Sequence, residues 1–268
     1  MIYFISVLGL FSLVFLFFIF LTSPANRKHQ DRALLEGTFI AHRGLHNLEN
    51  GIPENSLPAF LEAIKKNRPI ELDIHLTKDE KVVVFHDDNV KRACGVDQNI
   101  CKMTLEEIKK LRLFGTEYQI PTLEECLDLV NGKVFLLIEF KVDQNNTKKL
   151  CEKANEILSN YSGKYLIQSF YPQVLFWYRR NQKDVCRGQL SADFSIINFG
   201  KFLVGKQLMN FVGRPDFASF KYQDRSSPFF RLVVLLGAVP VGWTFRSKKE
   251  LDKNRKYFHS YIYENFEM

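Results

Sequence analysis

The chain shows two patterns of hydrophobic and polar positions. From Ile2 to Leu21 the residues are apolar and none is charged, whereas short apolar runs and amphipathic stretches alternate in the rest of the chain. A helix over the first run just crosses a hydrocarbon core of about 30 Å. The pattern therefore predicts a transmembrane helix or signal anchor over residues 1–22, a juxtamembrane linker over 23–37 and one large domain over 38–268.

The flanks of the first run bear on its cleavage and orientation. No Lys or Arg precedes it, and it is longer than the roughly 7 to 15 apolar residues of a cleaved signal peptide, although Ser23-Pro24-Ala25 leaves cleavage open. Arg27, Lys28 and Arg32 follow it. The positive-inside rule then predicts a single-pass membrane protein with residues 38–268 in the cytoplasm.

Extended and helical patterns alternate in residues 38–268. Helical stretches cover Leu57–Lys66, Thr104–Leu111, Thr147–Tyr161 and Lys248–Tyr257, between nine extended runs at 38–42, 69–76, 82–86, 133–141, 165–170, 185–191, 215–221, 239–245 and 260–266. The third run follows the second after a turn too short for a parallel crossover, so we expect it to return antiparallel. The other eight runs predict an α/β fold, a (β/α)8 TIM-type barrel with an insertion after the second strand. A doubly wound open sheet is the competing topology.

The composition of the chain indicates which classes of binding partner to expect. The net charge of +7 and the pI near 9.1 suit an anionic membrane surface or an acidic substrate, although a solvated basic face gives the same values. Basic residues are scattered and no nucleic-acid-binding module is visible, so we expect no nucleic-acid partner. Five cysteines without a CxxC spacing favour free thiols in a reducing compartment.

Charged residues gather on one face of the second strand. Side chains alternate along a strand, so Glu71, Asp73 and His75 share a face and the aliphatic residues share the other. Glu139 and Lys141 are arranged in the same way in a later strand. In a barrel the aliphatic faces meet the helices, which directs the charges toward the interior or the mouth, where they are costly unless paired or bound to a metal.

The recurrence of this pattern predicts a chemical site. One such strand could hold a structural ion pair, but His42-Arg43 and His86-Asp87 also stand at the ends of two other strands. Together these segments supply three acids for a hard metal, two histidines for proton transfer and two cations for an anion. Such a set suits hydrolysis of a phosphodiester, in which negative charge develops on phosphoryl oxygens and an alkoxide leaves.

An ordered series of short motifs resembles a known family, the glycerophosphodiester phosphodiesterases. The motifs stand in the family's order and at its usual spacing from residue 38 to the end of the chain: His42-Arg43-Gly44, Pro53-Glu54-Asn55-Ser56 with Ala59-Phe60, Glu71-Leu72-Asp73 with Thr77-Lys78-Asp79, Val83 to His86-Asp87, Pro121-Thr122-Leu123, Glu139-Phe140-Lys141, Gln168-Ser169-Phe170 and Trp243-Thr244. Each motif alone is weak, and the ordered set is specific.

The resemblance assigns roles to the candidate residues. It implies that Glu71, Asp73 and Glu139 bind a divalent cation, Mg or Ca, that His42 and His86 form the acid and base pair, and that Arg43 and Lys141 hold the phosphate. Asn55 and Trp243 are candidates for the substrate cleft, Asn55 being divided between the site and the start of a helix. We expect Ser56 to cap that helix and His46 to be solvated, while His75 is as readily a packed or exposed histidine as a functional one.

Two positions depart from the family pattern. Arg246 stands where many relatives have Asn, and Tyr263-Glu264-Asn265 occupies the last strand, where an acidic residue followed soon by Pro is common. We expect neither to touch the metal or proton-transfer residues, so that the departures bear on substrate choice.

These inferences predict a metal-dependent glycerophosphodiester phosphodiesterase that releases glycerol 3-phosphate and an alcohol in lipid metabolism. A lysophospholipase D acting on membrane lysophospholipids is a close alternative. A catalytically idle membrane-bound binding protein is less well supported. Such a protein would be expected to have lost some of the predicted metal ligands or histidines, and this chain has all of them. A phospholipase C type enzyme that makes a cyclic phosphate would share the barrel and a similar set of residues.

Overall fold

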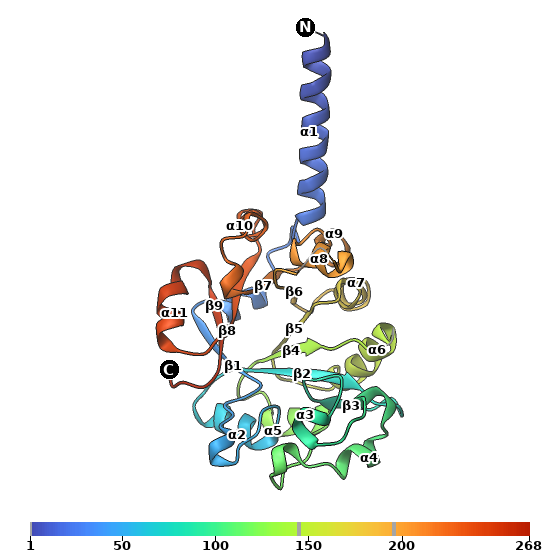
Figure 1. Ribbon diagram of the computed structural model, residues 1–268, viewed down its shortest axis with the longest axis vertical. Coiled ribbons are helices and arrows are strands. Elements are labelled where there is room, and N and C mark those ends of the chain that lie inside the picture. Colours follow the sequence, from blue (N-terminus) through green and yellow to red (C-terminus); the bar gives the residue numbers. More distant parts are fainter. Residues whose placement is uncertain (1, 144–145, 195–196) are drawn as a thin grey trace.

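Eight parallel strands close into a barrel in the computed structural model, which describes residues 2–143, 146–194 and 197–268, with the side chains of the first helix described from residue 9 (Figure 1). Closure follows from β1 (Thr38–His42), which pairs with β2 (Ile70–Leu76) on one side and β9 (Ser260–Tyr263) on the other. Between β2 and β9 the neighbours are, in chain order, β4 (Leu136–Phe140), β5 (Tyr165–Ser169), β6 (Arg187–Ser191), β7 (Phe217–Lys221) and β8 (Val239–Phe245). The TIM-type barrel is confirmed, and the open sheet is wrong.

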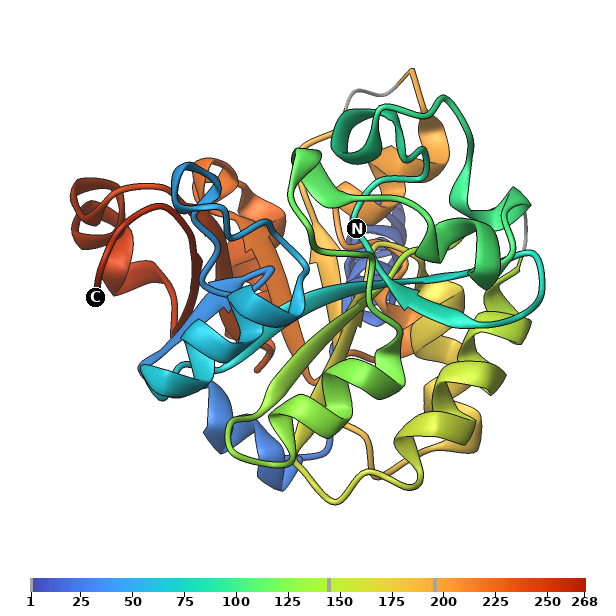
Figure 2. The same cartoon turned by 90° about the horizontal axis from the view of Figure 1, so that it is seen from below.

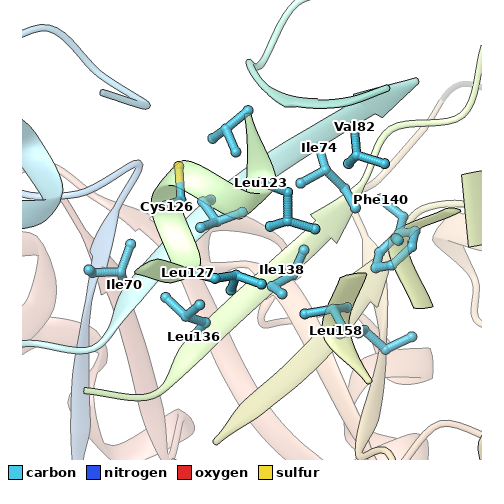
Figure 3. Close-up of a cluster of buried hydrophobic side chains, with 14 of the residues drawn as sticks. Ile70, Ile74, Val82, Leu123, Cys126, Leu127, Leu136, Ile138, Phe140 and Leu158 are labelled. Carbon is cyan, nitrogen blue, oxygen red and sulfur yellow. The ribbon is translucent and has the colours of Figure 1, made fainter. Parts of the chain in front are cut away.

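The ninth strand is the predicted antiparallel return. β3 (Val82–Val84) pairs antiparallel with β2, and α3 (Lys91–Cys94) and α4 (Leu105–Lys109) follow it. This insertion has a small buried core of its own, made by Val83, Phe85, Val90, Ala93, Ile100, Met103, Ile108, Leu113 and Ile120. The helix α5 (Leu123–Val130), which follows this insertion, belongs to the barrel, where Leu123 and Leu127 pack with the β2 and β4 side chains (Figure 3).

The aliphatic faces of the strands meet the surrounding helices. Ile70, Ile74, Ile138 and Phe140 lie in one buried cluster with α5 and α6 (Thr147–Leu158) (Figure 3). The ring continues with α2 (Leu57–Lys65), α7 (Pro172–Asn181), α8 (Phe199–Gly205), α9 (Asn210–Gly213), α10 (Pro228–Leu235) and α11 (Lys248–Asn254). Because the aliphatic side is taken up by helices, the alternate residues of each strand face the barrel interior.

The segment before β1 closes the amino-terminal end of the barrel. A 3-10 helix over Gln30–Leu35 places Leu35, fully buried, in the interior cluster with Ile40 and Phe217. Arg27 forms an ion pair of 2.8 Å with the buried Asp216 just before β7. Residues 23–37, predicted as a linker, are therefore packed against the barrel.

The first helix, α1 (Ile2–Thr22), projects from the barrel beside α9 and α10 (Figure 1). Phe18 lies 6.1 Å from Phe229 and Phe20 lies 5.7 Å from Phe211, measured between ring centroids. The part of the chain that the structure describes contains no helix long and apolar enough to cross a membrane. The predicted transmembrane helix is thus not confirmed.

Candidate active site

Three acids meet inside the barrel mouth. Asp73 on β2 stands opposite Glu139 on β4 in the sheet register, and Glu71 precedes Asp73 on the same face. An oxygen from each of the three carboxyl groups lies within 4.8 Å of the other two. All three residues are buried, with exposed fractions of 2% for Glu71, 0% for Asp73 and 6% for Glu139. The structure therefore brings together all three predicted metal ligands.

The electrostatics of this cluster suit a divalent cation. Burial, with Asp73 and Glu139 nearby, raises the pKa of Glu71 well above its usual value, and burial also raises the pKa of Glu139. Burial acts in the same direction on Asp73, but Lys141, His86 and Arg43 outweigh it and hold the pKa of Asp73 below its usual range. Three crowded carboxyl groups offer the oxygen ligands that Mg or Ca prefers, and a bound cation would relieve their repulsion.

Arg43 and Lys141 flank the acids. Lys141 contacts Glu139, and its Nζ lies 3.1 Å from Asp73 Oδ1 without completing a hydrogen bond to it. Arg43 donates its backbone N–H to Glu71 Oε2 at 3.1 Å, and its Nε lies 3.5 Å from Asp73 Oδ2. Two cations thus stand beside the acids, where an anionic substrate group can be held by both.

Local backbone geometry sets the direction of Arg43. Both Arg43 and Gly44 have positive φ values, 54° and 80°, which turn the chain sharply after β1. A Cβ atom on Gly44 would lie only 2.8 Å from the carbonyl carbon of Ala59 in α2. Only glycine fits this approach, which ties the loop carrying His42 and Arg43 to the α2 helix.

The two predicted catalytic histidines are each held by a carboxylate. His86 Nδ1 lies 2.6 Å from Asp87 Oδ1, and Asp87 accepts a hydrogen bond of 2.6 Å from Arg92 Nε. His42 Nδ1 contacts Glu264 Oε2. Burial, assisted by Arg43, lowers the pKa of His42 to about 4 although the contact with Glu264 favours its protonated form. Burial thus favours the neutral form of His42.

A family match accompanies this geometry. The sequence model of the "Glycerophosphoryl diester phosphodiesterase family" matches residues 42–258, which is more than half of the chain. The chain belongs to this family. It is accordingly a phosphoric diester hydrolase, and the resemblance drawn from the sequence motifs is confirmed. YhdW of Bacillus subtilis (strain 168), ascribed to the glycerophosphodiester phosphodiesterases, is 39% identical over 223 residues, which cover 80% of this chain and 88% of YhdW.

Two further similar proteins differ in sequence identity and in how much of each protein the match covers. The rat lysophospholipase D GDPD1 is 31% identical over 164 residues, covering 56% of this chain and 49% of the rat protein, so the match spans about half of that relative. A phosphodiesterase of Oleispira antarctica, solved in complex with the product sn-glycerol-3-phosphate, is 21% identical, has a TM-score of 0.72, and covers 86% of this chain and 94% of that chain. At this identity the second match shows the shared fold.

The secondary candidates are now placed within this family's barrel. Asn55 donates from Nδ2 to Asp73 Oδ2 at 2.8 Å, so it lies at the acid cluster. Ser56 caps α2, as predicted, by accepting from the Ala59 N–H. His75 is buried, and its Nε2 lies 3.2 Å from the backbone carbonyl oxygen of His86. It therefore contacts the backbone of a predicted catalytic histidine. Trp243 faces the interior from β8, with its ring 5.8 Å from that of Phe170; its part in the substrate cleft stays a prediction.

Two expectations about the residues around Glu264 were wrong. Glu264 contacts His42, and Arg246 Nε donates to Glu264 Oε1 at 2.7 Å, so these departures from the family pattern do reach one of the two predicted catalytic histidines. His46 is not solvated but lies with Nε2 3.6 Å from Glu264 Oε2, its side chain 14% exposed. The cause is barrel closure, which sets β9 beside β1.

Sequence reasoning also missed interior polar residues on later strands. Ser219 on β7 donates to Gln168 Oε1 on β5 at 2.8 Å, and Gln168 Nε2 reaches Glu71 Oε1 at 3.5 Å. Polar residues at inward positions of otherwise apolar strands were the available signal. This chain of contacts supports Glu71 from the far side of the barrel.

An open cleft of about 810 Å³ lies beside Glu264, and none of the three clustered acids lines it. Its walls come from the loop after β1, from the insertion and from the C-terminal segment, which lies beside that loop (Figure 2). Among its lining residues are His46, Glu54, Arg92, Phe114 and Glu264. The cleft therefore reaches Glu264, whose carboxylate contacts His42.

Proposed function

We propose that this protein hydrolyses glycerophosphodiesters to sn-glycerol 3-phosphate and an alcohol, with Mg or Ca as its cofactor, within glycerophospholipid metabolism. The observation that carries the proposal is the cluster of Glu71, Asp73 and Glu139 beside Arg43 and Lys141 in the barrel mouth. Support also comes from the 39% identity to YhdW and from the related barrel solved with sn-glycerol-3-phosphate.

Each part of the proposed site has a defined task. Glu71, Asp73 and Glu139 would hold a divalent cation, which would polarise the phosphoryl oxygens and offset the charge that develops on them. Arg43 and Lys141 orient the phosphate by charge-assisted hydrogen bonds. His42 and His86 form the proton-transfer pair, in which one ring takes a proton from the attacking water as its oxygen bonds to phosphorus, and the other protonates the alkoxide that departs as the P–O bond breaks.

The first test measures product formation by the full chain in detergent. Glycerol 3-phosphate released from glycerophosphocholine is followed with EDTA and with added Mg or Ca, for the wild type, His86→Ala and His259→Ala. His259 is exposed and serves as the matched control. We expect cation-dependent turnover that His86→Ala abolishes and His259→Ala retains. Equal turnover in EDTA, or full activity of His86→Ala, would contradict the proposal.

A lysophospholipase D activity is the second candidate. The match to the rat lysophospholipase D GDPD1 and the exposed apolar side chains of α1, such as Phe11 and Phe15, favour a lipid substrate. Comparison of kcat/KM for lysophosphatidylcholine in vesicles with that for glycerophosphocholine separates the two activities. A higher value for the lysolipid assigns the enzyme to that class.

We also propose that residues 1–22 attach the enzyme to a membrane as a single pass, with the barrel on the cytoplasmic side. The uncharged run from Ile2 to Leu21 and the basic residues Arg27, Lys28 and Arg32 after it support this orientation. The test is resistance of the full chain to alkaline carbonate extraction from membranes, and protease accessibility of the barrel in sealed vesicles of known orientation. Release by carbonate would contradict a membrane-spanning attachment.

A further inference from the structure

Glu264 lies directly after β9 with its carboxylate held by three other residues. Oxygen Oε2 contacts His42 Nδ1 and lies 3.6 Å from His46 Nε2, while Oε1 accepts a hydrogen bond of 2.7 Å from Arg246 Nε. The Glu264 side chain is 10% exposed. Its backbone N–H donates to the Phe245 carbonyl at 3.0 Å, which fixes the start of the side chain. Both oxygens are thus directed by neighbours, and one of them is directed at His42.

This arrangement selects one tautomer of His42. Although burial opposes it, the contacts with His42, His46 and Arg246 hold the pKa of Glu264 below its usual range, so the carboxylate is ionised. An ionised carboxylate only accepts hydrogen bonds, which places the proton of a neutral His42 on Nδ1. Nitrogen Nε2 then carries the lone pair, and it makes no hydrogen bond within the described part of the chain. It is the nitrogen left to exchange a proton with a substrate.

We propose that Glu264 is a positioning residue for the reaction: it holds the His42 ring in the Nδ1–H tautomer with Nε2 free for proton transfer, while Arg246 and His46 hold Glu264. The proposal rests on the proposed role of His42 in phosphodiester hydrolysis. Because β1 and β9 are neighbours in the closed barrel, the last strand supplies the partner of a histidine on the first.

His42, His46 and Glu264 could also form a metal site, and the experiment must distinguish that possibility from the positioning role. One ligand atom each from His42, His46 and Glu264 lies within 4.8 Å of the others, an arrangement that could also surround a transition metal. Zinc would displace the His42 Nδ1 proton. Arg246, whose cation already neutralises the second oxygen of Glu264, opposes this reading. Zinc binding at these residues is therefore an outcome that would overturn the proposal.

The experiment compares Glu264→Gln, Glu264→Asp and Glu267→Gln in the full chain. Gln keeps the shape but can present an amide N–H to Nδ1, which selects the other tautomer, whereas Asp keeps the charge. Glu267, on the same terminal segment, is 88% exposed and pairs with Lys66, so it is the matched control. With glycerophosphocholine and saturating Mg, we expect Glu264→Gln to lower kcat about 10- to 100-fold with KM changed less than about threefold. Asp should recover part of kcat, and Glu267→Gln should match the wild type.

Proton NMR of the His42 ring gives a readout that does not depend on turnover. We expect a downfield Hδ1 resonance in the wild type and in Glu267→Gln, absent from Glu264→Gln and from His42→Asn. Wild-type kcat in Glu264→Gln, a change in KM alone, or an unchanged resonance would overturn the proposal. Stoichiometric zinc binding by the wild type that removes the resonance, with no such binding by Glu264→Gln, would do the same. If the wild type hydrolyses neither glycerophosphocholine nor lysophosphatidylcholine, the proposed function fails, and the resonance alone decides whether Glu264 positions His42.

Discussion

Glu71 is the residue at which charge repulsion in the acid cluster is concentrated. Its raised pKa follows from burial and from Asp73 and Glu139, so the metal-free cluster favours the neutral form of Glu71, whereas a bound cation would favour the ionised form. Gln168 and the Arg43 N–H already contact both Glu71 oxygens, at 3.5 and 3.1 Å. A Gln at this position can accept the Arg43 N–H with its amide oxygen, and its NH2 can donate to Gln168 Oε1 once the Gln168 amide turns over and donates to Ser219 Oγ. With that turn, a neutral side chain of the same shape should be accepted in the metal-free protein.

We expect Glu71→Gln to leave the stability of the metal-free protein equal to or above that of the wild type, and to remove stabilisation by Mg or Ca. Wild-type protein at a cation concentration 100 times Kd gains about 2.7 kcal/mol. Thermal unfolding in EDTA and in excess cation measures both quantities. Glu62→Gln, which alters a surface pair with Lys65, is the control. A full cation-dependent rise in Tm for Glu71→Gln would exclude Glu71 as a ligand.

Gly44 should tolerate no side chain. Gly44→Ala adds a methyl group 2.8 Å from the Ala59 backbone at a positive φ, whereas Gly51→Ala has a similar φ of 72° with nothing within 4 Å. The shared φ strain is about 1 to 2 kcal/mol, so we expect Gly44→Ala to cost more than Gly51→Ala and also to lower kcat, since His42 and Arg43 would shift. Urea unfolding and turnover of both variants measure this. Equal losses of stability would remove the steric argument.

At the scale of elements, the insertion after β2 is a small unit attached to the site. Its core is separate from that of the barrel, and α4 starts with a reciprocal cap between Thr104 and Glu107. Arg92 in α3 joins it to the mouth through Glu54 at 2.6 Å and Asp87 at 2.6 Å. Order in the insertion should therefore affect His86 through Asp87.

We expect Ile108→Ala to loosen the insertion locally. Ile108 is fully buried in the insertion core, and its truncation should cost about 2 to 5 kcal/mol. In hydrogen exchange, amides of residues 90–120 should lose protection while those of α5 and α6 keep theirs, and kcat should fall. Lys110→Ala, on the exposed side of the same segment, should change neither. A uniform loss of protection throughout the barrel would show that the insertion has no independent stability.

Strand alternation explains why much of the site could be predicted. Within one strand the faces of Glu71, Asp73 and His75 follow from a period of two residues, and no knowledge of distant segments is needed. The Glu264–His42 contact spans 222 positions and depends on closure of the sheet. Hydrophobic patterns do not report which strands are neighbours. Once eight parallel strands are assumed, however, an acid after the last strand and a histidine ending the first are expected to approach each other.

At the scale of the whole molecule, the free energy of unfolding should depend on pH through the buried histidines. His75 is 1% exposed, and burial lowers its pKa to about 4 from about 6.5 in an unfolded chain. The unfolded chain therefore takes up the proton first. The stability contributed by His75 is complete above pH 6.5 and is lost as the pH falls toward 4. Between pH 7 and pH 5 this amounts to about 2 kcal/mol.

His75→Gln tests that contribution, because Gln can still donate to the His86 carbonyl but does not titrate. We expect the free energy of unfolding of the wild type to fall more steeply between pH 7 and pH 5 than that of His75→Gln, by about 2 kcal/mol in urea titrations. His259→Gln, at an exposed site, should follow the wild-type curve. Taking differences between variants cancels the shifted carboxyl groups, which are common to all three proteins. Parallel curves for wild type and His75→Gln would mean that His75 gains a proton in the folded barrel as readily as in the unfolded chain.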